Sequence, residues 1–326
     1  MAHEIDMSNG KANMAFTGSR DAIWHGLGQE LTPDSTIEEW QVQAGMNWAV
    51  KDSSVTFNAI NSDGIPSVNT VRGKKCLYRS DTLASLSIVG EDFNVVQPAE
   101  VLEFFRDLVA QHGMVLSTAG CLFGGNRFWA LAETGREMEI TKGDSVKGHL
   151  MFVTSVDGTL SNTAKFVSTR VVCNNTLSVA MKEGGRVMVR KTHRGVWDPT
   201  QAKLDLGLLD SSWDAFMVDL KRLSNRKMND GEVQNFFKKS FYDPKKDESD
   251  QPLGNRKRVN TLMELYTNGA GAEFAYGNAY GALNAVTNLF THGTGRQRVL
   301  ERKFWGAYFD NDGIKNGAME DLLAMC

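Results

Sequence analysis

The chain has 326 residues, of which 41% are apolar and 23% are charged, so it can bury a sizeable core and is not disordered. No apolar run approaches the roughly 20 residues that cross a bilayer. The first residues are acidic and polar, which is not typical of a signal peptide. These features predict a cytoplasmic protein that makes no membrane contact.

The net charge of −3 hides an uneven distribution of charge along the chain. Residues 1–52 carry eight acidic and three basic side chains, whereas residues 165–200 carry seven basic and two acidic ones. A basic block inside a nearly neutral protein is typical of a site for a polyanion. A solvated basic surface with no ligand would give the same pattern.

The first predicted element is a helix in residues 33–46. Ser35 can cap its N-terminus while Glu38 closes a capping box, and Ile37 and Trp40 share an apolar face. Segments with period-two alternation follow, on either side of an Asp-Gly turn signal, and predict strands.

A second helix is predicted in residues 97–113, with Pro98 in its first turn and Gly113 at its C-terminal cap. Residues 114–172 then read as four strands. A Gly-Gly hairpin signal separates the first pair, and an Asp-Gly turn signal separates the second. The chain next enters a helix at Asn174 or Asn175, either of which can cap it.

This order of elements predicts an α+β fold with an antiparallel β-meander followed by a helix, a β-β-β-β-α core. The last third reads as amphipathic helices joined by polar segments, with a charged linker at residues 242–255. We expect residues 1–195 to form an α+β domain with a central antiparallel sheet, and residues 196–326 to be mostly helical. The helical part can equally be a separate domain or pack onto the meander.

Cys173 lies where a predicted strand meets a predicted helix, and a helix N-terminus would lower the pKa of its thiol. No histidine lies nearby in the sequence to act as its base, although His149 or His193 could approach in space. Because cysteine is among the residues most often buried, we interpret Cys173 as structural.

The signatures of common enzymes are missing. The sequence has no GxGxxG after a strand, no GxxxxGK[ST], no HExxH and no CxxC pair. We therefore predict a protein that is not an enzyme and that has no catalytic residue, no metal and no cofactor. The four cysteines are expected to be reduced thiols.

The candidate binding residues are basic side chains, capping amides and an aromatic ring. An arginine at a strand end beside a capped helix would place a guanidinium next to free backbone N–H groups, which suits a phosphate. The amides could instead only cap the helix, and the arginine could pair with an acid. Phe128 and Trp129 lie on opposite faces of a strand, so one ring is expected in the core and the other at the surface, where it could stack on bases. The candidate nucleic-acid-binding residues are Arg127, Trp129, Lys165, Arg170, Asn174, Asn175, Arg186, Arg190, Lys191, His193 and Arg194.

Several segments together resemble a family of uncharacterised proteins carried by phages, prophages and plasmids. These segments are AIWHGLG, STRVVCNNTL with the basic strand after it, and AYGALNAVTNLFTH with the spaced arginines that follow. The resemblance covers nearly the whole chain and implies no catalytic residue. The layout of a β-meander, a helix and nearby basic and aromatic residues is also similar to the core of phage single-strand annealing proteins.

Annealing proteins form rings or filaments and bind DNA along a basic groove without ATP. The similarity therefore implies an ATP-independent protein that binds single-stranded DNA as a homo-oligomer in the cytoplasm of a host cell. The alternative is a counter-defence protein that binds and inhibits a host immune complex, with the acidic N-terminal region as part of its surface. An enzyme with an unrecognised site is a third hypothesis.

Overall fold

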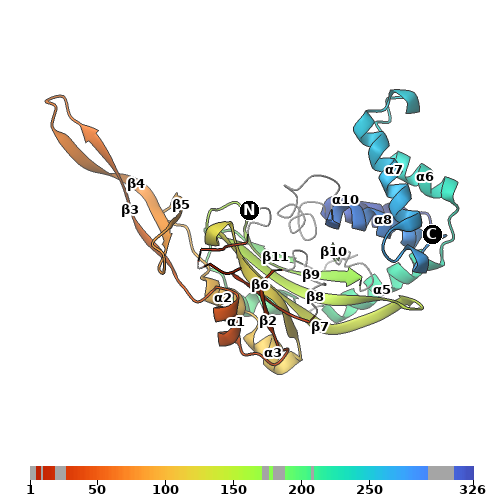
Figure 1. Ribbon diagram of the computed structural model, residues 1–326, viewed down its shortest axis with the longest axis horizontal. Coiled ribbons are helices and arrows are strands. Elements are labelled where there is room, and N and C mark those ends of the chain that lie inside the picture. The colour runs from red at the N-terminus through yellow and green to blue at the C-terminus, as the bar shows by residue number, and fades with distance from the viewer. Residues whose placement is uncertain are drawn as a thin grey trace.

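The fold is built from two β-sheets and a group of C-terminal helices (Figure 1). The computed structural model describes residues 5–8, 10–18, 27–170, 176–178, 188–206, 209–292 and 312–326.

The main sheet contains eight strands among the described residues, in the order β10-β9-β8-β7-β6-β1-β2, with β11 also paired to β9. All of its pairs are antiparallel except that of β1 with β2, which is parallel. Its strands are β1 (Met14–Thr17), β2 (Gln29–Leu31), β6 (Val115–Leu122), β7 (Arg127–Thr141), β8 (Asp144–Ser155), β9 (Asn162–Arg170), β10 (Thr176–Ser178) and β11 (Met188–Lys191). Strands β6 to β9 are the predicted meander, so the α+β class and the antiparallel sheet are confirmed.

The prediction of a helix that begins at Asn174 or Asn175 is wrong for the three residues that follow. Thr176–Ser178 form β10, which pairs with the edge of β9 from Thr169 to Val167. Hydrogen bonding to an open strand edge outweighs the local capping signal here, as tertiary context commonly does. Strands β10 and β11 both lie along this edge, and the next helix described is α4 (Pro199–Leu206).

Both faces of the main sheet are covered by apolar side chains. Phe128 and Phe152 belong to a large cluster that also contains Phe104, Phe216 and other helical residues. The opposite face carries a smaller cluster that includes Trp129, packed with residues of the N-terminal segment. The expectation that one ring of the Phe128 and Trp129 pair is exposed is therefore wrong, because both rings are buried.

A second sheet has three strands in the order β3-β4-β5: β3 (Val50–Ile60), β4 (Pro66–Arg79) and β5 (Ser85–Gly90). Beyond β5 the first two strands continue as a ribbon that projects far from the body of the molecule (Figure 1). The Asp-Gly turn signal lies at its tip, where Gly64 has a φ of 77°. These are the strands that the period-two segments predict.

The helices of the first half lie against one side of the main sheet, below it in Figure 1. Helix α1 (Ile37–Gln43) is capped by Thr36 and Glu39, one residue later than the predicted pair of Ser35 and Glu38. The predicted helix in residues 97–113 is divided into α2 (Pro98–Glu103) and α3 (Arg106–His112), and it ends at Gly113 with a φ of 64°, as expected.

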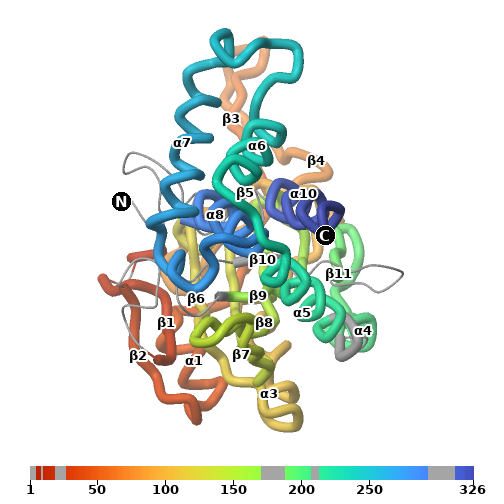
Figure 2. The backbone as a smooth tube through the Cα atoms, turned by 90° about the vertical axis from the view of Figure 1, so that its right-hand side faces the viewer, coloured from red at the N-terminus to blue at the C-terminus, as the bar shows by residue number. Residues whose placement is uncertain are grey.

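The C-terminal part is helical, as predicted. Its helices also include α5 (Leu209–Asn225), α6 (Asp230–Phe241), α7 (Leu253–Asn268), α8 (Ala279–His292) and α10 (Asp312–Leu323). Helices α6 and α7 stand side by side, and α8 packs against both α7 and α5 (Figure 2). One continuous apolar cluster joins these helices to the sheet, so the helical part packs onto the meander. One of the amphipathic helices predicted for the last third, in residues 296–306, lies outside the described residues.

In the described part of the chain, no helix combines the length and the apolar character needed to cross a membrane.

Candidate nucleic-acid interface

Three exposed cations lie at one edge of the main sheet. Arg190 and Lys191 are the last residues of β11, and Arg194 lies in the turn that follows, where the Gly195 N–H donates to the Thr192 carbonyl (3.2 Å). Successive strand residues point to opposite faces, so Arg190 and Lys191 place charge on both sides of this edge. The three side chains are therefore accessible to a polyanion.

His193 fixes the turn that carries these cations. Its ring is buried between two loops, with Nδ1 3.1 Å from the Asn94 carbonyl oxygen and Nε2 2.8 Å from that of Leu160. The ring also stacks on Phe93, with centroids 4.2 Å apart. His193 was predicted to bind nucleic acid directly, but in this conformation it positions its neighbours and presents no surface to a phosphate.

Arg127 begins β7 on the same face of the sheet as Arg190, because the register aligns β7, β8, β9 and β11 across that face. Three inter-strand steps of about 4.8 Å separate β7 from β11, or about 14 Å. The Arg127 guanidinium donates to Thr159 Oγ1 (2.9 Å) and lies over the Phe123 ring. Arg127 is half-buried, so it borders the exposed group.

Two other predicted residues lie in the interior. Trp129 is 1% exposed and Lys165 is 2% exposed. The indole fits because Gly120 of β6 lies opposite, where a Cβ atom would come within 2.6 Å of the Trp129 ring. In this conformation neither side chain can reach a base or a phosphate.

The remaining predicted binding residues lie wholly or partly outside the part of the chain that the structure describes. The backbone of Arg170 ends β9, but its side chain is not among the described ones. The other candidates outside the described residues are Cys173, Asn174, Asn175 and Arg186.

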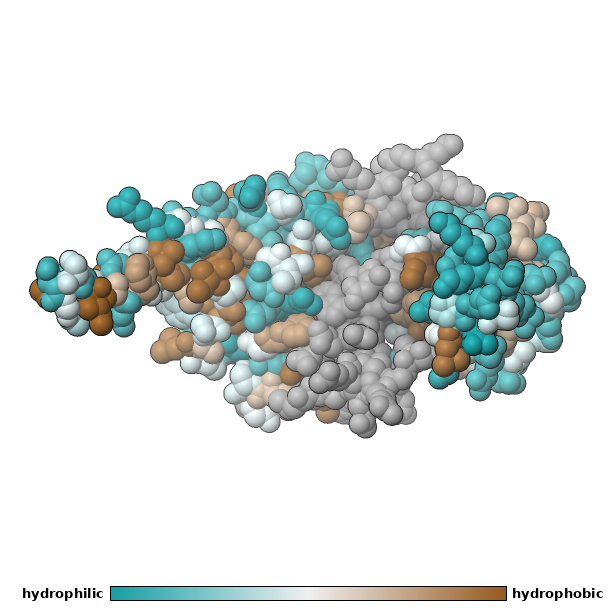
Figure 3. Space-filling view, turned by 90° about the horizontal axis from the view of Figure 1, so that it is seen from above, coloured by the Kyte–Doolittle hydropathy of each residue, from teal (hydrophilic) through white to brown (hydrophobic). Residues whose placement is uncertain are grey.

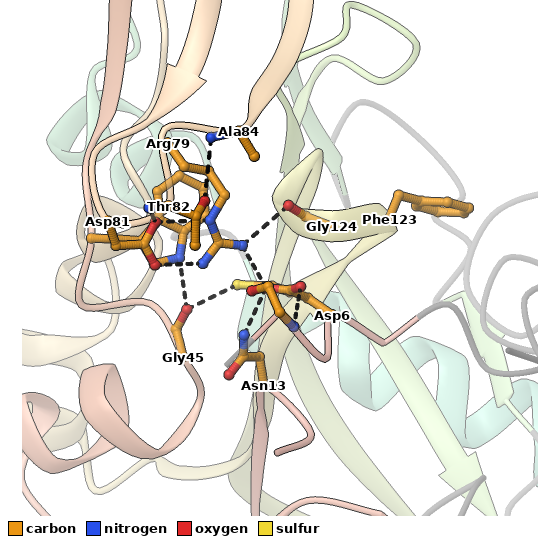
Figure 4. A network of polar contacts seen from close by, with 12 residues as sticks. Asp6, Asn13, Gly45, Arg79, Asp81, Thr82, Ala84, Phe123 and Gly124 are labelled. Atoms are coloured by element: carbon orange, nitrogen blue, oxygen red, sulfur yellow. Dashed lines mark hydrogen bonds and ion pairs between the residues drawn. The ribbon is translucent and has the colours of Figure 1, made fainter. Parts of the chain in front are cut away.

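A buried ion cluster that sequence reasoning missed joins the second sheet to the main one (Figure 4). The Arg79 guanidinium donates to Asp6 Oδ2 (2.5 Å), to both carboxylate oxygens of Asp81 (2.9 and 2.8 Å) and to the Gly124 carbonyl oxygen (3.1 Å). It also lies 4.0 Å from the ring centroid of Trp48, a cation–π contact. One side chain therefore holds the N-terminal segment, the base of β4 and the β6–β7 turn together.

The cluster keeps Asp6 ionised. Burial alone would raise the pKa of Asp6, but hydrogen bonds from Arg79 and Asn13 outweigh burial, so the pKa lies below its ordinary value. Nearby, burial raises the pKa of the Cys121 thiol well above its ordinary value. Cys121 is therefore an uncharged thiol at neutral pH, which suits packing better than nucleophilic chemistry.

His149 of β8 is a buried histidine on the smaller-cluster face. Its Nε2 lies 4.0 Å from Glu133 Oε1. Burial lowers the pKa of His149 to about 4, although the charge of Glu133 opposes the shift. The side chain is therefore neutral at pH 7.

This histidine predicts a dependence of stability on pH. Between pH 6.5 and about 4 the unfolded chain binds a proton at His149 that the folded chain does not, so stability falls as the pH falls. From pH 7 to pH 5 the loss should be about 2 kcal/mol. Urea unfolding at the two pH values should show a smaller loss in His149→Gln than in the wild-type protein. An unchanged loss in His149→Gln would contradict this assignment.

No group of three or more His, Cys, Asp and Glu side chains in the described residues could hold a metal ion. The cysteines that can be placed, Cys76, Cys121 and Cys326, are free thiols.

The fold and the site thus define an α+β protein with a broad, mainly antiparallel sheet and a group of exposed cations at its edge. The chain belongs to the family of the domain of unknown function DUF932, whose model matches residues 85–305. That range includes β11 and its basic residues and leaves out the projecting β3–β4 ribbon. No curated protein and no solved structure matches this chain.

Proposed function

We propose that this protein binds single-stranded DNA through its phosphates and anneals complementary strands without ATP. The observation that carries the proposal is the exposed group of Arg190, Lys191 and Arg194, held at the sheet edge by the buried His193. Because these cations lie on a strand and a tight turn, they form a region of high positive charge density with a fixed position on the surface. A phosphate backbone needs charge density of this kind more than a detailed geometry.

Binding of this kind should not depend on base sequence. Phosphate contacts carry no base information, and the buried Trp129 offers no face on which a base could stack. The preference for single strands rests on the similarity in layout to phage annealing proteins. The same similarity supports a homo-oligomer that acts in the cytoplasm of a host cell, because an array of subunits adds many weak contacts.

Fluorescence anisotropy with labelled strands of about 30 nucleotides tests the proposal. Two single strands of unrelated sequence should bind with similar affinity at low salt, and binding should weaken steeply as salt rises. Complementary strands mixed with the protein should pair faster than without it when no ATP is present. Absence of binding at 50 mM salt would contradict the proposal and favour the alternative, a counter-defence protein that contacts a host complex.

A further inference from the structure

Among the described residues, the projecting β3–β4 ribbon has no neighbour along most of its length. Strand β5 pairs with β4 from Lys74 to Tyr78, and Ser54 of β3 lies opposite Lys75. The part from Thr56 to Gly73 is therefore a bare two-stranded hairpin in the described structure (Figure 1). Most of its side chains are exposed on both faces. An isolated two-stranded hairpin is marginally stable in water, so a long one that stands alone calls for a partner.

The ribbon also exposes large apolar side chains. Phe57 is 51% exposed, and Ile60, Ile65 and Val68 are 60–73% exposed. Apolar side chains gather along the ribbon, which forms the left end of the molecule in Figure 3. Exposed apolar groups concentrated on one element mark an interaction surface. Since residues 53–73 carry only Asp63 and Arg72 as charged residues, this surface does not suit a polyanion.

The two edges of the ribbon differ in how they are protected. The β4 edge begins with Pro66, carries Arg72 and is covered by β5 near its base. The β3 edge has no charged residue, no proline and no glycine from Ser53 to Asn61. Natural sheets protect a free edge with such residues unless the edge pairs with another strand. The β3 edge is therefore the one available for pairing.

We propose that β3 pairs with β3 of a second copy of this chain, antiparallel about a two-fold axis at Phe57. In this register Phe57 lies opposite Phe57 of the partner subunit, and Val55 lies opposite Ala59 of the partner subunit. The three residues share one face of β3, because alternate residues of a strand do. The pairing thus turns a half-exposed apolar row into a cross-strand apolar cluster, with an aromatic pair at its centre.

Charge selects this register. With Phe57 at the axis, the turn at the tip, which carries Asp63 beyond the end of β3 at Ile60, lies beside the partner's Lys51, and the symmetry repeats this contact. An axis at Thr56 or Asn58 shifts the two strands by two residues, or about 7 Å, and moves Asp63 away from Lys51. Both Lys51 and Asp63 are exposed in the single chain. The β3 edge is therefore complementary to itself in shape and in charge, as a two-fold interface requires.

The shape of the molecule allows the pairing. The ribbon projects from one end of the body, so antiparallel ribbons place the two bodies at opposite ends of the pair (Figure 1). Each tip then lies beside the base of the partner's ribbon. This dimer does not depend on nucleic-acid binding.

Cysteine cross-linking tests the pairing, in a Cys326→Ser background that removes an exposed thiol. Under mild oxidation, Phe57→Cys should give a covalent dimer, because residues opposite each other in antiparallel strands lie within disulfide distance. Val68→Cys is the control, since Val68 is more exposed than Phe57 but lies on β4, so three strand spacings of about 14 Å in total separate its strand from β4 of the partner subunit. Equal yields from the two variants, or no dimer from Phe57→Cys, would overturn the proposal.

A charge exchange tests the register. Lys51→Glu and Asp63→Lys alone should each weaken the dimer about 2- to 30-fold, because each variant replaces two opposite-charge contacts with like-charge ones. The double variant should recover most of the wild-type affinity, measured by analytical ultracentrifugation. If the double variant loses as much dimer affinity as the two single variants combined, this register is wrong. A wild-type chain that stays monomeric at 100 µM would overturn the proposal.

Discussion

Replacing Arg79 with leucine should lower the free energy of unfolding by about 3–5 kcal/mol. The change leaves the carboxylate of Asp6 buried without its guanidinium partner, and it removes the contact between the base of β4 and the β6–β7 turn. An ionised group left alone in the interior is among the most destabilising defects in a protein. Urea unfolding monitored by tryptophan fluorescence measures the loss.

The matched control is Arg222→Leu. Arg222 pairs with Asp219 on α5 with its side chain 47% exposed, and exposed ion pairs contribute about 1 kcal/mol or less. A loss in Arg79→Leu as small as that in the control would mean that the buried cluster does not hold the two sheets together. Partial recovery of stability in Arg79→Leu combined with Asp6→Asn would show that the unpaired carboxylate causes the loss.

Replacing Arg190, Lys191 and Arg194 together with alanine should reduce the affinity for single-stranded DNA about 100-fold at 0.1 M salt. The estimate follows from three lost phosphate contacts at about 0.7 released counterions each. Because the side chains are exposed, the variant should keep the wild-type midpoint of unfolding. Fluorescence anisotropy and urea unfolding measure the two quantities.

The control for this variant removes the same charge elsewhere. Lys245, Lys246 and Lys257 are exposed and lie in and beside α7, away from β11. Their triple alanine variant should retain most of the affinity. An equal loss in both variants would mean that net charge, and not the sheet edge, sets the binding.

The four strands of the meander, β6 to β9, could be predicted because their signals are local. Period-two alternation and turn signals mark the meander and the tip of the ribbon. The cap of α1 was displaced by one residue because Ser35 and Thr36 are each followed by a glutamate three residues later, so two capping boxes compete. In the structure Thr36 and Glu39 form the box, while Glu38 pairs with Arg106, a distant residue that the local pattern cannot reveal.

The local sequence signals gave a wrong prediction where tertiary contacts determine the secondary structure or the burial of a side chain. Thr176–Ser178 follow good capping residues, yet they pair with β9, whose open edge a local pattern cannot reveal. The charged and aromatic side chains of the meander could be assigned to faces of the sheet. Both faces proved to be covered, and this fact removes Trp129 and Lys165 from the surface.

The buried ion cluster had no signal in the sequence. Asp6 and Arg79 are 73 residues apart, and each reads as an ordinary surface charge in its own segment. His193 shows the same limit, because its role depends on carbonyl groups of two distant loops. The exposed cations of β11 could be predicted, since charge in an alternating strand is a local property.

The most direct test of phosphate binding at the sheet edge is the slope of the logarithm of the association constant against the logarithm of the salt concentration. It should be measured with one short single strand for the wild-type protein and for the triple variant of Arg190, Lys191 and Arg194. The slope should be shallower by about two units in the variant. Equal slopes for the two proteins would contradict phosphate binding by these three side chains.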